Sequence, residues 1–240
     1  MKKTKFGAII MSALIILSSC NASNATKGGV IGGGSGAALG ALVGGLIGKN
    51  AGGALIGAGI GAAVGTGAGV LIGKKMDKAK KAAEASVANA QVETVTDARG
   101  LEAVKITFDS GILFKSGSYT LSSSAMANLT QFTNNVLKVY NDCDVAIQGY
   151  TDNQGWKNST VEESIQKNIT LSQNRADAVK SYLLAQGAAA SQIKSSTGFG
   201  QNNPVASNDT KEGQAQNRRV EVYLYASEAM INSANAGTLQ

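Results

Sequence analysis

The amino-acid sequence predicts an α/β (α+β) two-layer sandwich preceded by a glycine-zipper helical hairpin. From Gln91 to Ala226 the composition is that of a globular domain, and strand-like segments alternate with helix-like ones. Residues 28–73, in contrast, carry glycine at nearly every fourth position and a single charged residue, Lys49. These two patterns divide the chain into an apolar N-terminal part and one C-terminal domain.

The first twenty residues have the pattern of an export signal. A lysine-rich start precedes an apolar run over 6–17 that is too short to span a bilayer as a stable helix. The run ends in "LSSC", which resembles a bacterial lipobox whose cysteine becomes the lipidated first residue of the mature chain. We predict a lipoprotein signal peptide at 1–19, lipidation at Cys20 and a lipid-anchored tether at 20–27. The alternative is a plain signal peptide in which Cys20 is incidental.

The glycine ladder runs from Gly28 to Gly52, shifts by one residue, and continues from Gly53 to Gly73. Each glycine weakens a helix in water by about 1 kcal/mol relative to alanine. In lipid the backbone must satisfy its own hydrogen bonds, and regularly spaced glycines let two helices approach closely. We predict a glycine-zipper hydrophobic helical hairpin at 28–73, either membrane-inserted or self-associating. A flexible Gly/Ala linker is the alternative.

Two flanking segments are predicted to lie outside the globular domain. Residues 74–90 are rich in lysine and alanine and are predicted to be a basic linker, an exposed short helix or spacer. Their lysines could face a phospholipid surface, although a solvated helix face is the commoner meaning of such a run. Residues 227–240 are assigned as a C-terminal tail. The globular domain is therefore predicted at 91–226.

Within this domain the strands are predicted from alternation and turn residues. A β-hairpin over 91–108 turns at "DARG", and Val104, Ile106 and Phe108 alternate with polar residues. "DVAIQGY", "QIKSSTGFG" and "NRRVEVYLY" are the other strand candidates, the last with Val220, Val222 and Leu224 facing inward. This set predicts one sheet with a returning last strand.

Two helices are predicted between the strands. Ser122–Ser124 can cap a helix in which Leu129, Phe132 and Val136 share one face. A second helix is predicted to start near Thr170–Ser172 and to stop at Gly187. About 135 residues are enough to bury one core.

The composition narrows the chemistry of the chain. It has no histidine, so the usual general base and the commonest metal ligand are missing. The formal charge of +6 falls to about +3 without the three signal lysines, which is too weak for a nucleic-acid footprint. With Cys20 lipidated, Cys143 has no disulfide partner and is predicted to lie in the core. We therefore predict no catalytic residue, no metal, no cofactor and no nucleic-acid partner.

Two opposite charges flank a polar loop in the middle of the domain. Asp152 follows a strand, and Arg175 is predicted in the first turn of the next helix. From the residues alone, the pair is either a surface salt bridge, typically contributing about 0–1 kcal/mol, or two halves of a site for a zwitterion. The loop between them contains Trp156, the only tryptophan, which could cover a pocket or bind something else.

Four motifs, in a fixed order along the chain, favour the zwitterion site over the surface salt bridge. "ITFDSGILF", "GYTDNQG", "LSQNRADAVKSYLLAQG" and "TGFGQNNPVASNDTKEGQAQNRRVEV" resemble the successive motifs of the OmpA-like peptidoglycan-binding domain family. The resemblance covers roughly residues 104–225, about half of the chain, and implies an OmpA C-terminal-like fold. The chain departs from the family pattern in a loop about eight residues longer after "GYTD", and in Tyr150, where many members carry histidine.

The resemblance also implies a ligand and its contacts. In this family the ligand is the meso-diaminopimelate of the peptidoglycan stem peptide, whose side-chain end carries an amine and a carboxylate. Asp152 matches the acid that holds the ammonium, and Arg175 matches the arginine that holds the carboxylate through a bidentate fork. The remaining matches are the flanking Thr151 and Asn153, the pocket-lining segment of Phe108 and Asp109, and Arg218 and Arg219, of which one shapes the site and the other braces the fold.

Together these features resemble the small outer-membrane lipoproteins of Gram-negative bacteria. They predict a non-catalytic lipoprotein that binds peptidoglycan and tethers the outer membrane to the wall, with its globular domain in the periplasm. The predicted partners are peptidoglycan and the membrane, reached through the lipid anchor and the glycine zipper, with a homo-oligomer left open. The alternative is a membrane-inserting oligomeric assembly formed by the glycine zipper, with wall binding as an anchor. A wall-degrading enzyme is a third hypothesis, disfavoured by the missing histidine.

Overall fold

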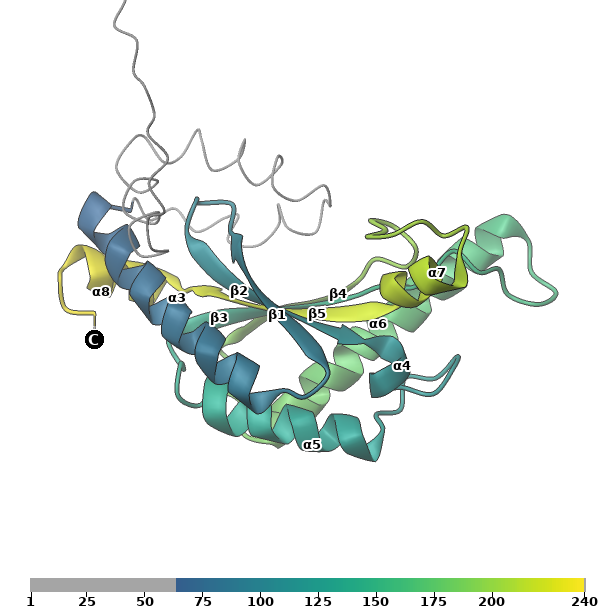
Figure 1. Ribbon diagram of the computed structural model, residues 1–240, viewed down its shortest axis with the longest axis horizontal. Helices are drawn as coiled ribbons and strands as arrows, with labels where there is room; N and C mark the ends of the chain where they lie inside the picture. The colour runs from purple at the N-terminus through teal and green to yellow at the C-terminus, as the bar shows by residue number, and fades with distance from the viewer. Residues whose placement is uncertain (1–63, 240) are drawn as a thin grey trace, which may run out of the picture.

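The computed structural model describes residues 64–239, which build a five-stranded sheet with helices packed on one face (Figure 1). The strands lie in the order β1-β2-β5-β3-β4, with β3 and β4 parallel and the other neighbours antiparallel. Their bounds are β1 Ala90–Thr96, β2 Glu102–Asp109, β3 Cys143–Gly149, β4 Ile193–Gly198 and β5 Arg219–Ala226. The predicted hairpin, the three further strands and the two-layer sandwich are confirmed.

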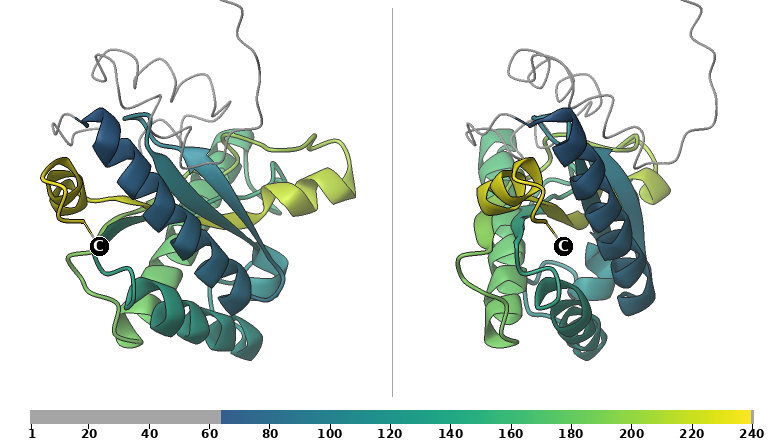
Figure 2. Two further views of the ribbon diagram at one scale, coloured as in Figure 1. Left: turned by 60° about the vertical axis from the view of Figure 1, so that its left-hand side comes forward. Right: turned by 90° about the vertical axis from the view of Figure 1, so that its left-hand side faces the viewer.

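The helices are α3 Thr66–Ser86, α4 Ser110–Leu113, α5 Ser123–Phe132, α6 Val161–Ala185, α7 Lys211–Asn217 and α8 Glu228–Asn235, with a π-helical turn, η2, at Thr133–Leu137. α3, α5 and α6 bury their apolar stripes in one core against the sheet, and Figure 2 shows them on that side from two further directions. As predicted, the side chain of Ser122 caps α5 by accepting a hydrogen bond from the Ala125 amide, 3.1 Å away.

β5 is the central strand and is buried along its whole length. Its alternation places Val220, Val222 and Leu224 in the main core, as predicted. Tyr223 and Tyr225 fall on the opposite face, in a smaller apolar cluster with alanines of β2 and β3. The strand is flanked by β2 and β3, so its backbone hydrogen bonds are satisfied on both edges.

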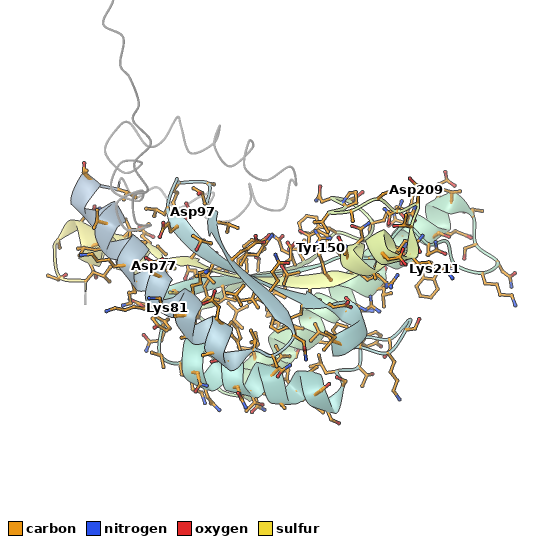
Figure 3. All side chains as sticks on the ribbon, viewed as in Figure 1. Asp77, Lys81, Asp97, Tyr150, Asp209 and Lys211 are labelled. Carbon is orange, nitrogen blue, oxygen red and sulfur yellow. The ribbon has the colours of Figure 1, made fainter. Side chains whose placement is uncertain are left out.

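Most of the segment 74–90 belongs to α3, so the helical form of its prediction is confirmed, but its placement outside the domain as an exposed linker is wrong. The helix buries Ile72, Met76, Ala79 and Ala83, a stripe at helical spacing that packs into the main core. Its charged residues, among them Lys81, occupy the other faces (Figure 3). The apolar stripe was not recognised in the sequence because it consists mainly of small residues and lies among many lysines.

The assignment of 227–240 as a tail is also wrong. Met230 and Ile231 of α8 are buried in the main core, and α8 packs beside α3. The Gly65 amide donates a hydrogen bond to the Asn235 side-chain oxygen at 2.9 Å, which joins the two ends of the described chain. The domain therefore extends beyond 91–226 on both sides.

The predicted hairpin at 28–73 lies outside the described residues except for 64–73, where the last rungs of the ladder form the start of α3. Gly69 and Gly73 are buried there. Within residues 64–239, none of the helices combines the length and the apolar character that a membrane crossing requires.

Candidate ligand-binding site

The site begins where β3 ends, and hydrogen bonds from two other segments fix its start. The Tyr150 amide donates to the Arg219 carbonyl at 2.9 Å, and the Thr151 amide donates to the Gly200 carbonyl at 2.8 Å. These bonds hold the chain in place beyond the last residue of β3. Asp152 therefore emerges beside Arg218, the residue that precedes β5.

Close packing of α6 against the strand ends brings the second half of the site into place. A Cβ atom on Gly149 would collide with the Ser172 carbonyl oxygen, and one on Gly198 would collide with the Gln173 amide nitrogen. Only glycine allows this approach of helix and strands. Arg175 follows one turn later and is thereby placed over the end of the sheet.

α6 differs from the predicted helix at its start. It begins at Val161, with a capping box in which Thr160 and Glu163 each bond the other's backbone amide. Arg175 therefore lies in the middle of a long helix and is only 4% exposed, so its predicted place in a first turn is wrong. The loop expected at 154–169 is therefore shorter and ends where α6 begins, at Val161.

Asp152, Arg175 and Arg218 line one cavity of about 690 Å³. Its walls come from α4 and the loop after it, from the loop after β3, from α6 and from the residue before β5. The lining residues are Ser110, Gly111, Phe114, Lys115, Ser116, Gly117, Thr151, Asp152, Gln154, Gly155, Trp156, Lys157, Asn168, Leu171, Arg175 and Arg218.

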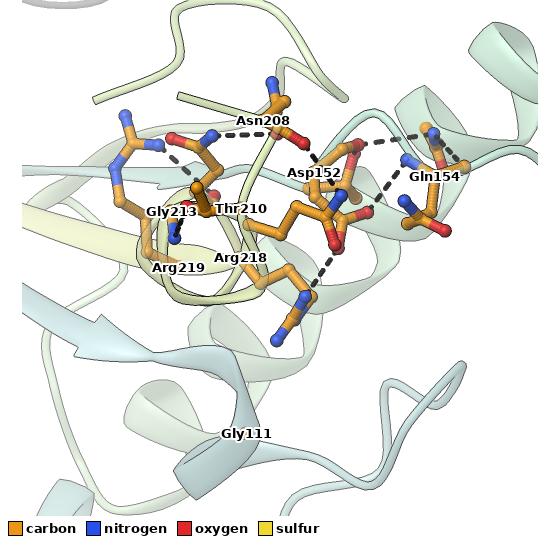
Figure 4. A network of polar contacts seen from close by, with 12 residues as sticks. Gly111, Asp152, Gln154, Asn208, Thr210, Gly213, Arg218 and Arg219 are labelled. Atoms are coloured by element: carbon orange, nitrogen blue, oxygen red, sulfur yellow. Dashed lines mark hydrogen bonds and ion pairs between the residues drawn. The ribbon is translucent and has the colours of Figure 1, made fainter. Parts of the chain in front are cut away.

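The carboxylate of Asp152 is largely buried and oriented by two donors (Figure 4). Arg218 Nη1 donates to Oδ2 at 2.6 Å, and the Gln154 amide donates to Oδ1 at 3.1 Å. Each carboxylate oxygen can accept more than one hydrogen bond, so both retain capacity toward the cavity. The acid is thus held in a fixed orientation at the cavity wall.

The guanidinium of Arg175 is positioned by neutral groups. Its Nε donates to the Ser118 carbonyl at 3.0 Å, and its Cζ lies 5.3 Å from the ring centre of Phe114, which makes a cation–π contact. Within residues 64–239, its two terminal nitrogens make no hydrogen bond or ion pair. Burial, and to a lesser degree the charge of Arg218, lowers the pKa of Arg175 from its usual value, while Asp152 acts in the opposite direction.

The cavity carries more positive than negative charge. Lys115 and Lys157 are exposed at its edge and join Arg175 and Arg218, whereas Asp152 is the single carboxylate among the lining residues. A cavity with this balance attracts ligands that carry more carboxylates than amines.

Arg219, next to Arg218, points away from the cavity and is 2% exposed. It donates to Glu221 at 2.8 Å and to the Asn203 carbonyl at 3.2 Å, and its Cζ lies 3.8 Å from the ring centre of Tyr150. A buried ion pair with these additional contacts braces the sheet below Asp152. Of the two neighbouring arginines, one therefore lines the cavity and the other supports the fold.

The structure brings together four of the seven predicted binding residues and leaves three outside the cavity. Thr151, Asp152, Arg175 and Arg218 are lining residues. Neither Asn153, which is exposed, nor Phe108, which is buried in the core, is among the residues that line the cavity. Asp109 caps α4 by accepting from the Gly111 amide at 2.5 Å and faces a different cavity, one of about 440 Å³. The residues just after it, Ser110 and Gly111, take the predicted place.

The prediction from the sequence missed Phe114, Lys115, Lys157 and Asn168, which reach the cavity only through the fold. Trp156 was noted in the loop, and it does line the cavity. The S/T-x-x-E pattern of Thr160 and Glu163 would have revealed the true start of α6. Cys143 is buried as predicted, and burial together with the charge of Asp142 raises the pKa of its thiol.

Residues 113–218, which contain most of the site described above, match the family model described as the OmpA family. Residues 1–77 match the family model of the YMGG-like Gly-zipper. Both parts of the resemblance read from the motifs are thereby confirmed.

Among curated proteins, the chain is similar to the Escherichia coli (strain K12) protein named "Probable lipoprotein YiaD", with 40% identity over 130 residues, 54% of this chain and 55% of that protein. It is also similar to the Mycobacterium tuberculosis (strain H37Rv) "Peptidoglycan-binding protein ArfA", with 49% identity over 88 residues, 37% of this chain and 24% of that protein. The similarity thus spans about half of the first relative and a quarter of the second.

Among solved structures, the chain resembles a MotB-like protein from Desulfovibrio vulgaris with a TM-score of 0.52 and 22% identity. The match covers 65% of this chain and 94% of that one. At this identity the likeness shows a shared fold. It agrees with the sheet and helix arrangement described above.

Proposed function

We propose that the described domain is a non-catalytic peptidoglycan-binding module that recognises the zwitterionic end of diaminopimelate in the stem peptide. Arg175 holds the carboxylate of this group and Asp152 holds its ammonium. Thr151 and Arg218 support the acid. The proposal for the wall as partner draws on the OmpA family match and on the printed name of one relative, a peptidoglycan-binding protein.

The observation that carries the proposal is the state of Arg175. A guanidinium that is 4% exposed is expensive to bury without an anion, yet within residues 64–239 no carboxylate pairs with it. It lines a cavity, and its planar fork matches a carboxylate in two hydrogen bonds. A ligand carboxylate would accept hydrogen bonds from the terminal nitrogens of Arg175 and balance its charge.

Asp152 supplies the opposite charge on the same cavity. The oriented acid offers remaining lone pairs to an ammonium group, and one wall thus presents an anion while another presents a cation. Opposite charges held apart on a rigid frame suit a zwitterion, because each ligand charge meets a group that is already positioned.

The experiment is binding of the full chain, purified in detergent, to wall sacculi and to a stem tripeptide that ends in diaminopimelate. Asp152→Asn and Arg175→Lys are each expected to weaken binding by about a hundredfold, because a ligand charge loses its oriented partner. A tripeptide with lysine in place of diaminopimelate keeps the amine and loses the carboxylate. It should bind poorly to the wild type, and Arg175→Lys should distinguish far less between the two peptides.

Arg219→Lys is not a suitable control, because Arg219 is part of the fold. Asn153→Ala is the matched control, since Asn153 is exposed beside Asp152 and lies outside the cavity lining. It should leave binding unchanged. Normal wall binding by both charge variants, with lower melting temperatures, would reduce Asp152 and Arg175 to structural residues and overturn the proposal.

We further propose the arrangement of the whole chain around this domain. Its parts are a signal peptide at 1–19, lipidation at Cys20, a tether at 20–27 and a glycine-zipper segment from 28 to the start of α3, followed by the domain of 64–239. An outer-membrane anchor and a periplasmic wall-binding domain would together tether the membrane to the wall. The lipoprotein relative and the YMGG-like Gly-zipper match support this arrangement.

The Gly-zipper match also favours a second candidate, a membrane-inserting homo-oligomer that uses wall binding as an anchor. Leakage of liposomes caused by the full chain, and lost when Gly40 and Gly61 are replaced by leucine, would support it. Intact liposomes at the same protein concentration would leave the tether as the whole function.

A further inference from the structure

We propose that Trp156 forms a second subsite, which binds the sugar ring that carries the stem peptide. This inference rests on the proposed function and extends it from the peptide to the glycan strand. The juxtaposition that carries it is a pre-oriented indole ring on the wall of the cavity that contains Asp152 and Arg175.

Trp156 is held in place although it is 36% exposed. Its indole Nε1 donates to Asn168 Oδ1 at 2.8 Å, and its backbone amide donates to Ser164 Oγ at 3.0 Å. Both partners lie on α6. These hydrogen bonds fix the orientation of the indole ring in the absence of a ligand. Such preorganisation lowers the entropic cost of binding, which favours a role for the ring in ligand binding.

The same contacts connect the indole to the acid. Asn168 Nδ2 donates to the Gln154 carbonyl at 3.2 Å, and the Gln154 amide donates to Asp152 Oδ1. One short loop therefore fixes Asp152 and Trp156 relative to each other. A ligand that contacts both Asp152 and Trp156 can therefore bind without rearrangement of this loop.

The size of the cavity leaves room for more than one amino-acid side chain. Its volume of about 690 Å³ lies within the range of about 300–1,000 Å³ that pockets for drug-sized ligands occupy. The diaminopimelate residue is separated from the sugar by two residues of the stem, so these two residues span at most about 7 Å at about 3.5 Å per residue. The sugar then falls within reach of the cavity edge.

The chemistry of the edge fits a pyranose ring. The indole nitrogen is already bonded, so the aromatic face is what Trp156 can offer a ligand. One face of a pyranose presents C–H groups, which pack on the electron-rich face of an aromatic ring, while its hydroxyl and acetamido groups point outward. Gln154 and Lys157, exposed on either side of Trp156 in the loop, supply polar groups for that periphery.

The test compares two ligands by calorimetry on the full chain in detergent: the diaminopimelate tripeptide alone, and the same tripeptide attached to N-acetylmuramic acid. The wild type should bind the muramyl tripeptide about tenfold more tightly than the free peptide, an increase on the order of 1.4 kcal/mol. Trp156→Ala should remove this gain and leave the affinity for the free peptide within about twofold. Trp156→Phe should retain most of the gain, because the aromatic face remains.

Fluorescence provides an independent reading, because Trp156 is the only tryptophan of the chain. The muramyl peptide should shift its emission and the free peptide should not. Val161→Ala is the matched control, since Val161 is 71% exposed at the start of α6, the helix that anchors Trp156, and does not line the cavity. It should bind both ligands as the wild type does.

The outcomes separate this inference from the proposed function. Equal affinity of the wild type for the two ligands, or an equal loss for both in Trp156→Ala, overturns the sugar subsite while peptide binding stands. Failure of the wild type to bind either ligand overturns the proposed function and the subsite with it.

Discussion

Arg218 pairs with Asp152 across a distance of 2.6 Å between Nη1 and Oδ2, and this pairing leaves Arg175 without an anion among the described residues. The two charges first identified in the sequence therefore do not neutralise each other. Arg218 lies immediately before β5 and is about two-fifths exposed, so it can orient the acid from the side that faces solvent. The cavity keeps one oriented carboxylate and one unpaired guanidinium.

Arg218→Ala is expected to weaken binding to sacculi by about tenfold, less than the changes at Asp152 or Arg175. The acid would lose its orienting partner while keeping its charge. Because Arg218 is partly exposed, its loss should lower the free energy of unfolding by only about 0.5–1 kcal/mol. Sacculus pull-down and denaturant titration measure the two effects, and Arg218→Lys should fall between the alanine variant and the wild type. Tighter binding by Arg218→Ala would mean that Arg218 competes with the ligand for Asp152.

Gly149→Ala is expected to destabilise the domain by about 1–3 kcal/mol, because the new methyl group would push against the Ser172 carbonyl oxygen. The same displacement of α6 would move Arg175 and weaken wall binding. Gly67→Ala is the matched control, since nothing lies within 4 Å of a Cβ at this helical position. It should raise stability by up to about 1 kcal/mol. Thermal melts of both variants measure these changes in stability. Equal changes in the melting temperature would contradict the packing argument.

Met76→Ala is expected to lower the free energy of unfolding by about 2–5 kcal/mol, because Met76 is 1% exposed in the main core. Lys74→Ala, on an exposed face of the same helix, should change it by no more than about 0.5 kcal/mol. Urea denaturation of the full chain provides the measurement. If Met76→Ala proved as mild as Lys74→Ala, α3 would be a linker after all.

Asp144→Asn is expected to raise the melting temperature at pH 7. Burial raises the pKa of Asp144 above its usual value despite the partner Lys194, so the folded state binds this proton more tightly than the unfolded state does. A raised carboxyl pKa destabilises the fold at neutral pH, and this penalty disappears as the pH falls through the folded pKa and below the unfolded value of about 3.9. The lost contact with Lys194 should matter little, because that lysine is about half exposed. Melts at pH 7 and pH 3.5 test this, and a lower melting temperature at pH 7 would show that the ion pair outweighs burial.

Cys20→Ala is expected to leave an unprocessed or mislocalised precursor, because "LSSC" is the sequence pattern from which lipid attachment is predicted. Metabolic labelling with a fatty acid should mark the wild type and not the variant. Equal labelling of both proteins would remove the lipoprotein interpretation.

The sequence by itself determined the sheet and its inward faces. Alternation in "VKITF" and "RVEVYLY" and the turn "DARG" predicted the hairpin and the central strand, because a strand buried on one face repeats every two residues. The family resemblance of the motifs also predicted that Thr151, Asp152, Arg175 and Arg218 lie together, and all four line one cavity. The sequence also contains the capping box that marks the start of α6, although the helix was predicted to start about ten residues later.

Only the tertiary structure decided which groups pair and which segments belong to the core. Neither the pairing of Asp152 with Arg218, 66 positions away in the chain, nor the placement of Trp156 against Asn168 leaves a local pattern. The burial of α3 was not predicted, because Ala79, Ala83 and two glycines form much of its buried face, and small residues carry little hydrophobic signal. They are buried because the sheet and α8 approach that face closely, and this proximity arises only when distant segments fold together.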